Sequence, residues 1–297
     1  VIDDGSTDAT ADLVRGRLPD APRLTFLAAG PLPEGWRGKV HALEVGAEGV
    51  ASPWLLLTDA DTRHHPELLA RSLAAATAGD RLAALSLAGS QEVQGLAENL
   101  LTPAVFALLD LLLGDWRGAA SGAGGPPVAN GQYILLRRAA WEGCGGFATV
   151  RAETLDDVAI VTRLRAHGHR TGFFRAPGLL SIRMYRGARE VARGWRRNLG
   201  GLLGLRPGIV AISLAVLLVP PLVAGAELAA GHPAAALLLW AAGAAASALF
   251  RAGSGHAPAW GLLYPLDALF LAAVLGSGAA DRRRGRLATW KGREIRF

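Results

Sequence analysis

Cysteine is almost absent from this chain of 297 residues, because Cys144 is the only one. A single thiol excludes an intrachain disulfide, so the fold must rest on a hydrophobic core rather than on covalent crosslinks. Cys144 lies among glycines, in Gly143-Cys144-Gly145-Gly146. We expect it to be a small packing residue rather than a nucleophile.

Charge is missing from one long stretch. Residues 1–206 carry charges at ordinary intervals, but the charged residues of the segment 207–280 are only Glu227, Arg251 and Asp267. This segment contains three apolar runs near the length that spans a bilayer, at about 208–230, 233–250 and 259–280. The composition predicts a catalytic domain over 1–206, a membrane region of two or three apolar helices over 207–281 and a basic cytoplasmic tail over 282–297.

The charges that are present are mostly basic, with 31 Lys and Arg against 25 Asp and Glu and a formal net charge of +6. Arginines cluster at 183–206 and 282–286, on either side of the apolar region. Such flanks favour anionic headgroups and the cytoplasmic face, which predicts a multi-pass protein of the cell (inner) membrane. If both basic flanks lie on one face of the membrane, the chain must cross the membrane an even number of times. Three apolar runs that each cross once would place the flanks on opposite faces. Pro220-Pro221 could turn the first run into a re-entrant hairpin, so the number of crossings stays open. No nucleic-acid motif accompanies the charge, and we expect no nucleic-acid partner.

Short apolar runs alternate with helical patterns through the first 182 residues. This alternation predicts an α/β fold with a doubly wound, mixed and mostly parallel sheet and flanking helices. The predicted strands are Val1-Ile2, 24–27, 54–57, 82–87, 130–137 and 173–174. The predicted helices are 9–17, 40–48, 66–78, 138–142 and 154–167, then an amphipathic pair over 92–113 and a basic amphipathic helix over 185–199. Because Val1-Ile2 resembles the end of a buried strand, we expect a strand and a helix to be missing before it.

Two acidic clusters follow predicted strands, where ligands bind in such sheets. Asp59 and Asp61 stand one residue apart directly after the apolar run 54–57. Carboxylates in this pattern can share Mg²⁺ or Mn²⁺, which prefer oxygen ligands and bridge to diphosphate oxygens. The alternative is a solvated turn that caps a helix. Asp3 and Asp4 follow the first strand, and with Ser6 they could bind a nucleobase and ribose.

Other polar residues carry weaker signals. Asp156 and Asp157 open a predicted helix, where they either cap it or supply a general base. Lys39 could pair with a phosphate or simply lie on the surface. Trp195 and Arg196 could contact a diphosphate or the membrane interface. His64 and His65 follow the second acidic cluster, and we read them as loop residues.

Taken in order, these motifs resemble family 2 glycosyltransferases of the GT-A fold. Five segments carry the resemblance: Val1–Asp8, Gly38–Leu43, Leu57–Asp61, Asn130–Phe147 and Leu155–Asp157. The resemblance implies a nucleotide-diphosphate sugar as donor, with a UDP-sugar expected. It places the donor at Asp3, Asp4, Ser6, Lys39 and Asp59, and the metal at Asp59 and Asp61. It assigns Asp157 as the base of a single inverting displacement, with acceptor or diphosphate contacts at Asn130, Gly131, Gln132 and Asp156.

The later part of the chain narrows the resemblance. Processive members of the family carry Q-x-x-R-W, whereas Ala192-Arg193-Gly194-Trp195-Arg196 lacks the glutamine. This favours transfer of one sugar over a polysaccharide synthase, which remains an alternative, as does a non-catalytic membrane scaffold. The segments Met184–Leu199 and Trp290–Arg293 are similar to the membrane-associated branch that includes carotenoid-acid and hopanoid-associated enzymes. That similarity implies a lipid or terpenoid acceptor.

Overall fold

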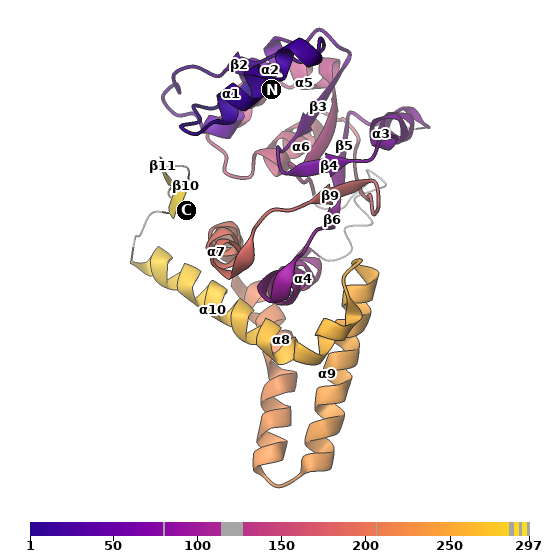
Figure 1. Cartoon of the computed structure of the whole chain (residues 1–297), viewed down its shortest axis with the longest axis vertical. Helices are drawn as coiled ribbons and strands as arrows, with labels where there is room; N and C mark the ends of the chain where they lie inside the picture. Colours follow the sequence, from indigo (N-terminus) through magenta and orange to yellow (C-terminus); the bar gives the residue numbers. More distant parts are fainter. Residues whose placement is uncertain (80, 114–126, 206, 285–287, 291–292, 296–297) are drawn as a thin grey trace. The chain divides into compact units, whose positions relative to one another are not determined.

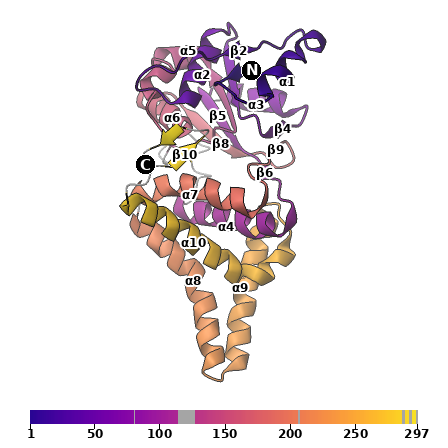
Figure 2. The same ribbon diagram turned by 60° about the vertical axis from the view of Figure 1, so that its left-hand side comes forward.

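The computed structural model describes residues 1–79, 81–113, 127–205, 207–284, 288–290 and 293–295. Its contacts divide the chain into two compact units (Figure 1, Figure 2). We call Val1–Gly89 with Trp116–Ser181 the α/β unit, and Ser90–Asp115 with Ile182–Phe297 the helical unit. Each unit is described by itself.

A four-stranded mixed sheet is the centre of the α/β unit. Its strand order is β3 (Trp54–Thr58), β7 (Tyr133–Arg137), β5 (Ala84–Ala88) and β8 (Thr171–Arg175). β7 runs antiparallel to both of its neighbours, and only β5 and β8 are parallel. The expectation of a mixed sheet is confirmed, but "mostly parallel" is wrong for these four strands. The prediction failed because an apolar run indicates only that both faces of a strand are buried. It does not indicate whether the strand runs parallel or antiparallel to its neighbours.

Smaller elements complete this unit. β1 (Ile2–Asp3) pairs in parallel with β2 (Leu27–Ala28), and β4 (Thr62–His64) pairs with β9 (Leu180–Ile182). The helices are α1 (Thr10–Arg15), η1 (Leu18–Asp20), α2 (Gly38–Glu48), α3 (Leu68–Thr77), α5 (Arg138–Gly143), η3 (Phe147–Val150) and α6 (Asp156–Ala166). The predicted helices of this unit are therefore confirmed, with ends that shift by a few residues.

Helices cover both faces of β7, which explains why Ile134, Leu135 and Leu136 at its centre are all apolar and buried. Alternate side chains of a strand point to opposite faces. Ile134 and Leu136 join a core formed with α2, β3, α5, η3 and α6. Tyr133 points to the other face, where its hydroxyl hydrogen-bonds Ser72 of α3. Cys144 is buried in the core that contains Ile134 and Leu136, as expected of a packing residue. Its thiol donates to the carbonyl of Trp141 at 3.2 Å.

The helical unit contains β6 (Ser90–Gln91), α4 (Gly95–Leu113), α7 (Gly187–Leu205), α8 (Pro207–Ala229), α9 (Pro233–Gly253), η4 (Pro258–Leu263) and α10 (Tyr264–Arg283). A hairpin of β10 (Ala288–Trp290) and β11 (Arg293–Ile295) follows. Side chains of α4, α7 and α10 form one core, which includes Val105, Val191 and Leu271.

α4 is one helix, whereas the sequence predicted an amphipathic pair over 92–113. Pro103 lies inside it and lacks the N–H that would bond to the carbonyl of Asn99. Arg251 of α9 replaces that donor, because its Nη1 donates to the Asn99 oxygen at 2.6 Å. Its Nη2 also donates to Asp267 of α10 at 2.6 Å. The helix continues through the proline because a side chain distant in sequence supplies the lost hydrogen bond.

α8 and α9 form an antiparallel hairpin that extends beyond α4, α7 and α10 (Figure 1, Figure 2). Two segments of the described chain are long and apolar enough to cross a membrane, Pro233–Gly253 and Pro258–Asp281. In the most apolar part of each segment, 11% is buried for Pro233–Gly253 and 39% is buried for Pro258–Asp281. Large apolar side chains of the hairpin face outward, among them Leu238 and Leu249 at 72% and 75% exposure.

Candidate functional site

The loop after β3 presents the first two carboxylates of the site, Asp59 and Asp61. Two threonine hydroxyls hold this loop. Thr58, the last residue of β3, donates to the carbonyl of Gln132 at 3.0 Å. Thr62 donates to the carbonyl of Asp59 at 2.7 Å. The hydrogen bond of Thr58 therefore holds the end of β3 to the segment before β7. The hydrogen bond of Thr62 closes the turn that contains Asp59.

Lys39 joins this loop to the start of α6. It lies in the first turn of α2, which begins at Gly38. Its Nζ is 3.2 Å from Asp59 Oδ1 and 3.7 Å from Asp156 Oδ2. The predicted phosphate-binding lysine and the predicted metal-binding loop thus meet in the structure.

Asp157 is held between α6 and the segment before β7. Its Oδ1 accepts the N–H of Val158, in the first turn of α6, at 2.8 Å. Its Oδ2 accepts the N–H of Gly131 at 2.8 Å. The carboxylate is fixed at two points, and its remaining lone pairs are the ones that could accept a proton or a further donor.

The segment Asn130-Gly131-Gln132 forms a tight turn beside these groups. Asn130 Nδ2 donates to Gln132 Oε1 at 2.8 Å, and the N–H of Gln132 donates to Asn130 Oδ1 at 3.1 Å. A Cβ added at Gly131 would lie 2.8 Å from Lys39 Nζ and 3.6 Å from Asp157 Oδ2. A side chain at this position would displace the Lys39 ammonium group, so glycine leaves room for the lysine beside the turn.

We call Asp59, Asp61, Asp156 and Asp157 the carboxylate cluster. Burial alone would lower the pKa of Lys39, but Asp156, Asp59 and Asp157 outweigh it and raise that pKa. Burial raises the pKa of Asp156 to about 6 against the pull of Lys39, with Asp157 adding to the rise. Burial also raises the pKa of Asp157, and burial together with Asp59 raises that of Asp61. Negative charge therefore exceeds positive charge at this site.

An excess of carboxylates is what a divalent cation and a diphosphate would use. In the described part of the chain, no three His, Cys, Asp or Glu side chains are placed to hold a metal by themselves. Mg²⁺ is commonly held by one or two carboxylates and completed by substrate phosphates and water. The residues fit an ion of this kind, because Asp59 and Asp61 offer only oxygen ligands and Asp59 already attracts an ammonium group.

Comparison with known proteins bears on this geometry. Residues 1–183 match the family model described as "Glycosyltransferase like family 2". The chain belongs to this family. It is a glycosyltransferase, and its matched region contains every member of the carboxylate cluster and Lys39. No curated protein matches the chain.

Solved structures share the fold of this glycosyltransferase. One is the mannosyltransferase PcManGT from Pyrobaculum calidifontis in complex with GDP-Man and Mn²⁺, with 23% identity, 95% of this chain and 77% of that chain covered, and a TM-score of 0.56. Another is glucosyl-3-phosphoglycerate synthase from Mycobacterium tuberculosis in complex with Mn²⁺ and UDP-glucose, with 17% identity, coverage of 69% and 66%, and a TM-score of 0.40. At 23% identity, the similarity to the mannosyltransferase structure supports the GT-A fold of this chain.

The structure places the other predicted site residues of the glycosyltransferase in two surroundings. Asp3 ends β1 and Asp4 and Ser6 follow it, and the N–H of Ser6 donates to Asp3 Oδ1 at 3.1 Å. Trp195 is 4% exposed and packs in the core of the helical unit. Arg196 is exposed and lies 3.5 Å from Asp281. Their roles toward the nucleotide and the diphosphate stay predictions.

Sequence reasoning placed His64 in a loop, whereas it is the last residue of β4 and contacts the polar residues that shape the turn after β3. His64 Nε2 lies 3.0 Å from Thr58 Oγ1 and 3.2 Å from Thr62 Oγ1, and the ring packs edge-on against Tyr133. Burial lowers the pKa of His64, which favours the neutral ring. The available signal was the spacing Thr58-x-x-x-Thr62-x-His64, which places three polar side chains around one turn.

Proposed function

We propose that this glycosyltransferase moves one sugar from a nucleotide-diphosphate sugar to a hydroxyl or carboxyl group of a lipid or terpenoid acceptor at a membrane, with inversion at the anomeric carbon. A UDP-sugar is the expected donor. The carboxylate cluster is the observation on which this proposal rests. Its aspartates come from the loop after β3 and from the start of α6, and they lie around Lys39.

In this proposal Asp59 and Asp61 would hold Mg²⁺ or Mn²⁺. When bound, such an ion neutralises charge that develops on the leaving diphosphate. Lys39 is positioned to exchange a carboxylate for a phosphate oxygen, since its ammonium group forms charge-assisted hydrogen bonds with either. Asp3, Asp4 and Ser6 are assigned to the nucleoside. The complex of the mannosyltransferase with GDP-Man and Mn²⁺ supports a donor and ion of these classes.

Asp157 is the proposed base. It takes the proton from the acceptor oxygen while that oxygen forms its bond to the anomeric carbon and the bond from that carbon to the diphosphate breaks. The two backbone N–H groups on Asp157 support this role, because they orient the carboxylate and favour its ionised form. Asp156 is the second candidate, because burial raises its pKa to about 6, close to the pH at which a base must work.

The helical unit supports the proposed membrane location and an even number of crossings. α8 has 23 residues and α9 has 21. At about 1.5 Å per residue each helix reaches about 30 Å, the thickness of a bilayer core. We propose that this hairpin crosses and returns, while α10 packs against α4 and α7 at the cytoplasmic surface. α7 carries exposed arginines, so a helix packed along it is poorly placed to cross. Both basic flanks then lie on one face.

Calorimetry with the full chain in detergent tests the metal and donor assignments. Titration with UDP should give tight binding with Mn²⁺, and at least tenfold weaker binding with a chelator or in the Asp59→Asn variant. Asp12→Asn is the matched control, since Asp12 is an exposed aspartate of α1 that forms an ion pair with Arg15. Chelator-insensitive binding would contradict the metal site.

Mass spectrometry of lipid extracts tests the acceptor. Cells that express the chain should contain a lipid heavier by one sugar, and the Asp157→Asn variant should lack it. A ladder of added sugars would indicate a processive synthase. In a Cys144→Ser background, an impermeant thiol reagent applied to intact cells tests the crossings. It should label Ala230→Cys at the tip of the hairpin but not Arg284→Cys, and equal labelling would contradict the hairpin topology.

A further inference from the structure

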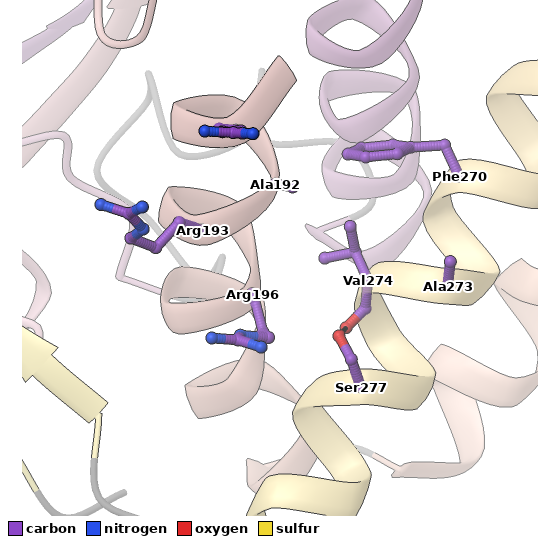
Figure 3. Close-up of a pocket in the computed structure, with 8 residues that line it drawn as sticks. Ala192, Arg193, Arg196, Phe270, Ala273, Val274 and Ser277 are labelled. Carbon is purple, nitrogen blue, oxygen red and sulfur yellow. Dashed lines mark hydrogen bonds between the residues drawn. The ribbon is translucent and has the colours of Figure 1, made fainter. Parts of the chain in front are cut away.

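A cavity of about 370 Å³ lies between α7 and α10 of the helical unit (Figure 3). The cavity walls are unlike each other in chemistry. The α7 wall carries Arg189, Ala192, Arg193 and Arg196, and the α10 wall carries Phe270, Ala273, Val274 and Ser277. Figure 3 shows Phe270 and Val274 extending from α10 toward α7, while the guanidinium group of Arg193 extends away from α10. The volume falls in the range of small-ligand sites, about 300–1,000 Å³.

The arginine wall carries uncompensated positive charge. Arg189 and Arg193 are four residues apart on one helix, so they project from the same face. Both are exposed, and neither has an ion-pair partner among the residues that the structure describes. Arg196 differs, because it lies 3.5 Å from Asp281. Both residues line the cavity, and the guanidinium group of Arg193 extends away from α10, so an anion with several oxygens that the two share would bind at the outer rim of the cavity, along α7.

The apolar wall continues beyond the cavity as an exposed stripe. Leu262, Leu266, Leu269 and Ala273 follow one another at helical spacing along η4 and α10, and each is exposed. The opposite side of α10, with Leu271 and Leu275, is buried against α4 and α7. A ligand that fills this place must therefore present an anion to α7 and a long apolar part to α10.

We propose that this cavity binds one anionic membrane phospholipid, with its phosphate group at Arg189 and Arg193 and an acyl chain along the stripe of α10. A soluble phosphate would leave the apolar wall unused, and a zwitterionic lipid would leave the arginine pair only partly neutralised. The inference rests on the proposed membrane location but does not depend on sugar transfer. It gives α7 and α10 a lipid-binding site of their own.

Native mass spectrometry of the full chain in detergent tests the site. The probe is dioleoyl phosphatidylglycerol, with dioleoyl phosphatidylcholine and inorganic phosphate in parallel. The wild-type chain should retain one phosphatidylglycerol at concentrations where it retains little phosphatidylcholine. The double variant Arg189→Gln/Arg193→Gln should bind the lipid about tenfold more weakly, as expected when two charge-assisted hydrogen bonds are lost. Arg283→Gln/Arg284→Gln removes the same charge outside the cavity and should change binding less than twofold.

A second variant separates the apolar part from the anion. Ala273→Phe keeps every charge and places a ring in the path of the acyl chain, so it should weaken phosphatidylglycerol at least fivefold. Equal weakening by the two double arginine variants would overturn the proposal in favour of diffuse attraction. So would equal retention of phosphatidylcholine, or displacement of the lipid by inorganic phosphate at equal concentration. Loss of the site with normal thiol labelling of the hairpin would leave the membrane topology intact.

Discussion

The two units balance their charged side chains in opposite ways, and they expose them to different extents: the Lys39 side chain of the α/β unit is 46% exposed, whereas Arg251 of the helical unit is buried. In the α/β unit, Lys39 faces a carboxylate cluster with more negative charge than it can neutralise. In the helical unit, Arg251 is 1% exposed and has one carboxylate partner, Asp267. Its other donors go to the carbonyls of Asn99 and Leu100 and to a serine hydroxyl.

This difference distinguishes a ligand-binding site, the carboxylate cluster, from a structural contact, the hydrogen-bonded ion pair of Arg251 and Asp267. A buried ion pair with satisfied hydrogen bonds can be retained without any ligand, and removing one partner leaves the other charge stranded. An unbalanced cluster costs stability until a cation or substrate completes it. The comparison predicts large catalytic effects at the cluster, and large stability effects at Arg251.

The largest expected effect is on catalysis at the cluster. Asp157→Asn should lower kcat by about a thousandfold, the usual contribution of a general base, while the dissociation constant of UDP with Mn²⁺ changes less than threefold. Steady-state kinetics and calorimetry on the same preparations measure the two quantities. If Asp156→Asn shows the larger loss of kcat and Asp157→Asn the smaller, the base is Asp156.

Arg251 should dominate the stability of the helical unit. Arg251→Met leaves Asp267 unpaired and the carbonyl freed by Pro103 without a donor, so it should cost about 3–5 kcal/mol. Thermal unfolding in detergent, followed by tryptophan fluorescence, measures the loss.

A second substitution sharpens this result. Pro103→Ala restores an N–H for the carbonyl of Asn99, so Arg251→Met should cost about 1 kcal/mol less in that background. Equal costs in both backgrounds would mean that Arg251 does not compensate for the proline.

The last expected effect is a gain in stability. Folding raises the pKa of Asp156 from 3.8 to about 6, so the folded protein binds this proton more tightly than the unfolded chain does. Stability is therefore lost as pH rises from about 4 through 6, and the cost is complete above that range. Asp156→Asn removes the ionisable group, and without metal it should stabilise the protein by about 3 kcal/mol at pH 7.5. The gain should vanish near pH 4. A gain that does not depend on pH would reject ionisation as its cause.

Part of the site was readable from local pattern. Asp59 and Asp61 stood out because two carboxylates followed a buried strand, and the structure puts them in the loop after β3. Lys39 was a weak candidate by itself, since a surface lysine is common. Its contact with Asp59 and Asp156 joins positions far apart in the chain. No local pattern records such a contact, because it depends on how helices pack across the sheet.

The same reason explains the errors in the fold. Pro103 predicted a break between two helices, since proline removes a helical hydrogen bond. The replacement donor is Arg251, about 150 residues later. The direction of β7 was likewise invisible, because burial on two faces looks the same for a parallel and an antiparallel strand.

The sequence by itself determined the α/β class, the positions of most helices and strands, the apolar region and the acidic residues at a strand end. These features follow from composition and from side-chain periodicity over a few residues. Only the tertiary structure decided which charges meet: three aspartates around Lys39, and one arginine bonded to Asp267 and to the carbonyls of α4. Electrostatic balance is a property of neighbours in space, and the chain brings those neighbours together only when it folds.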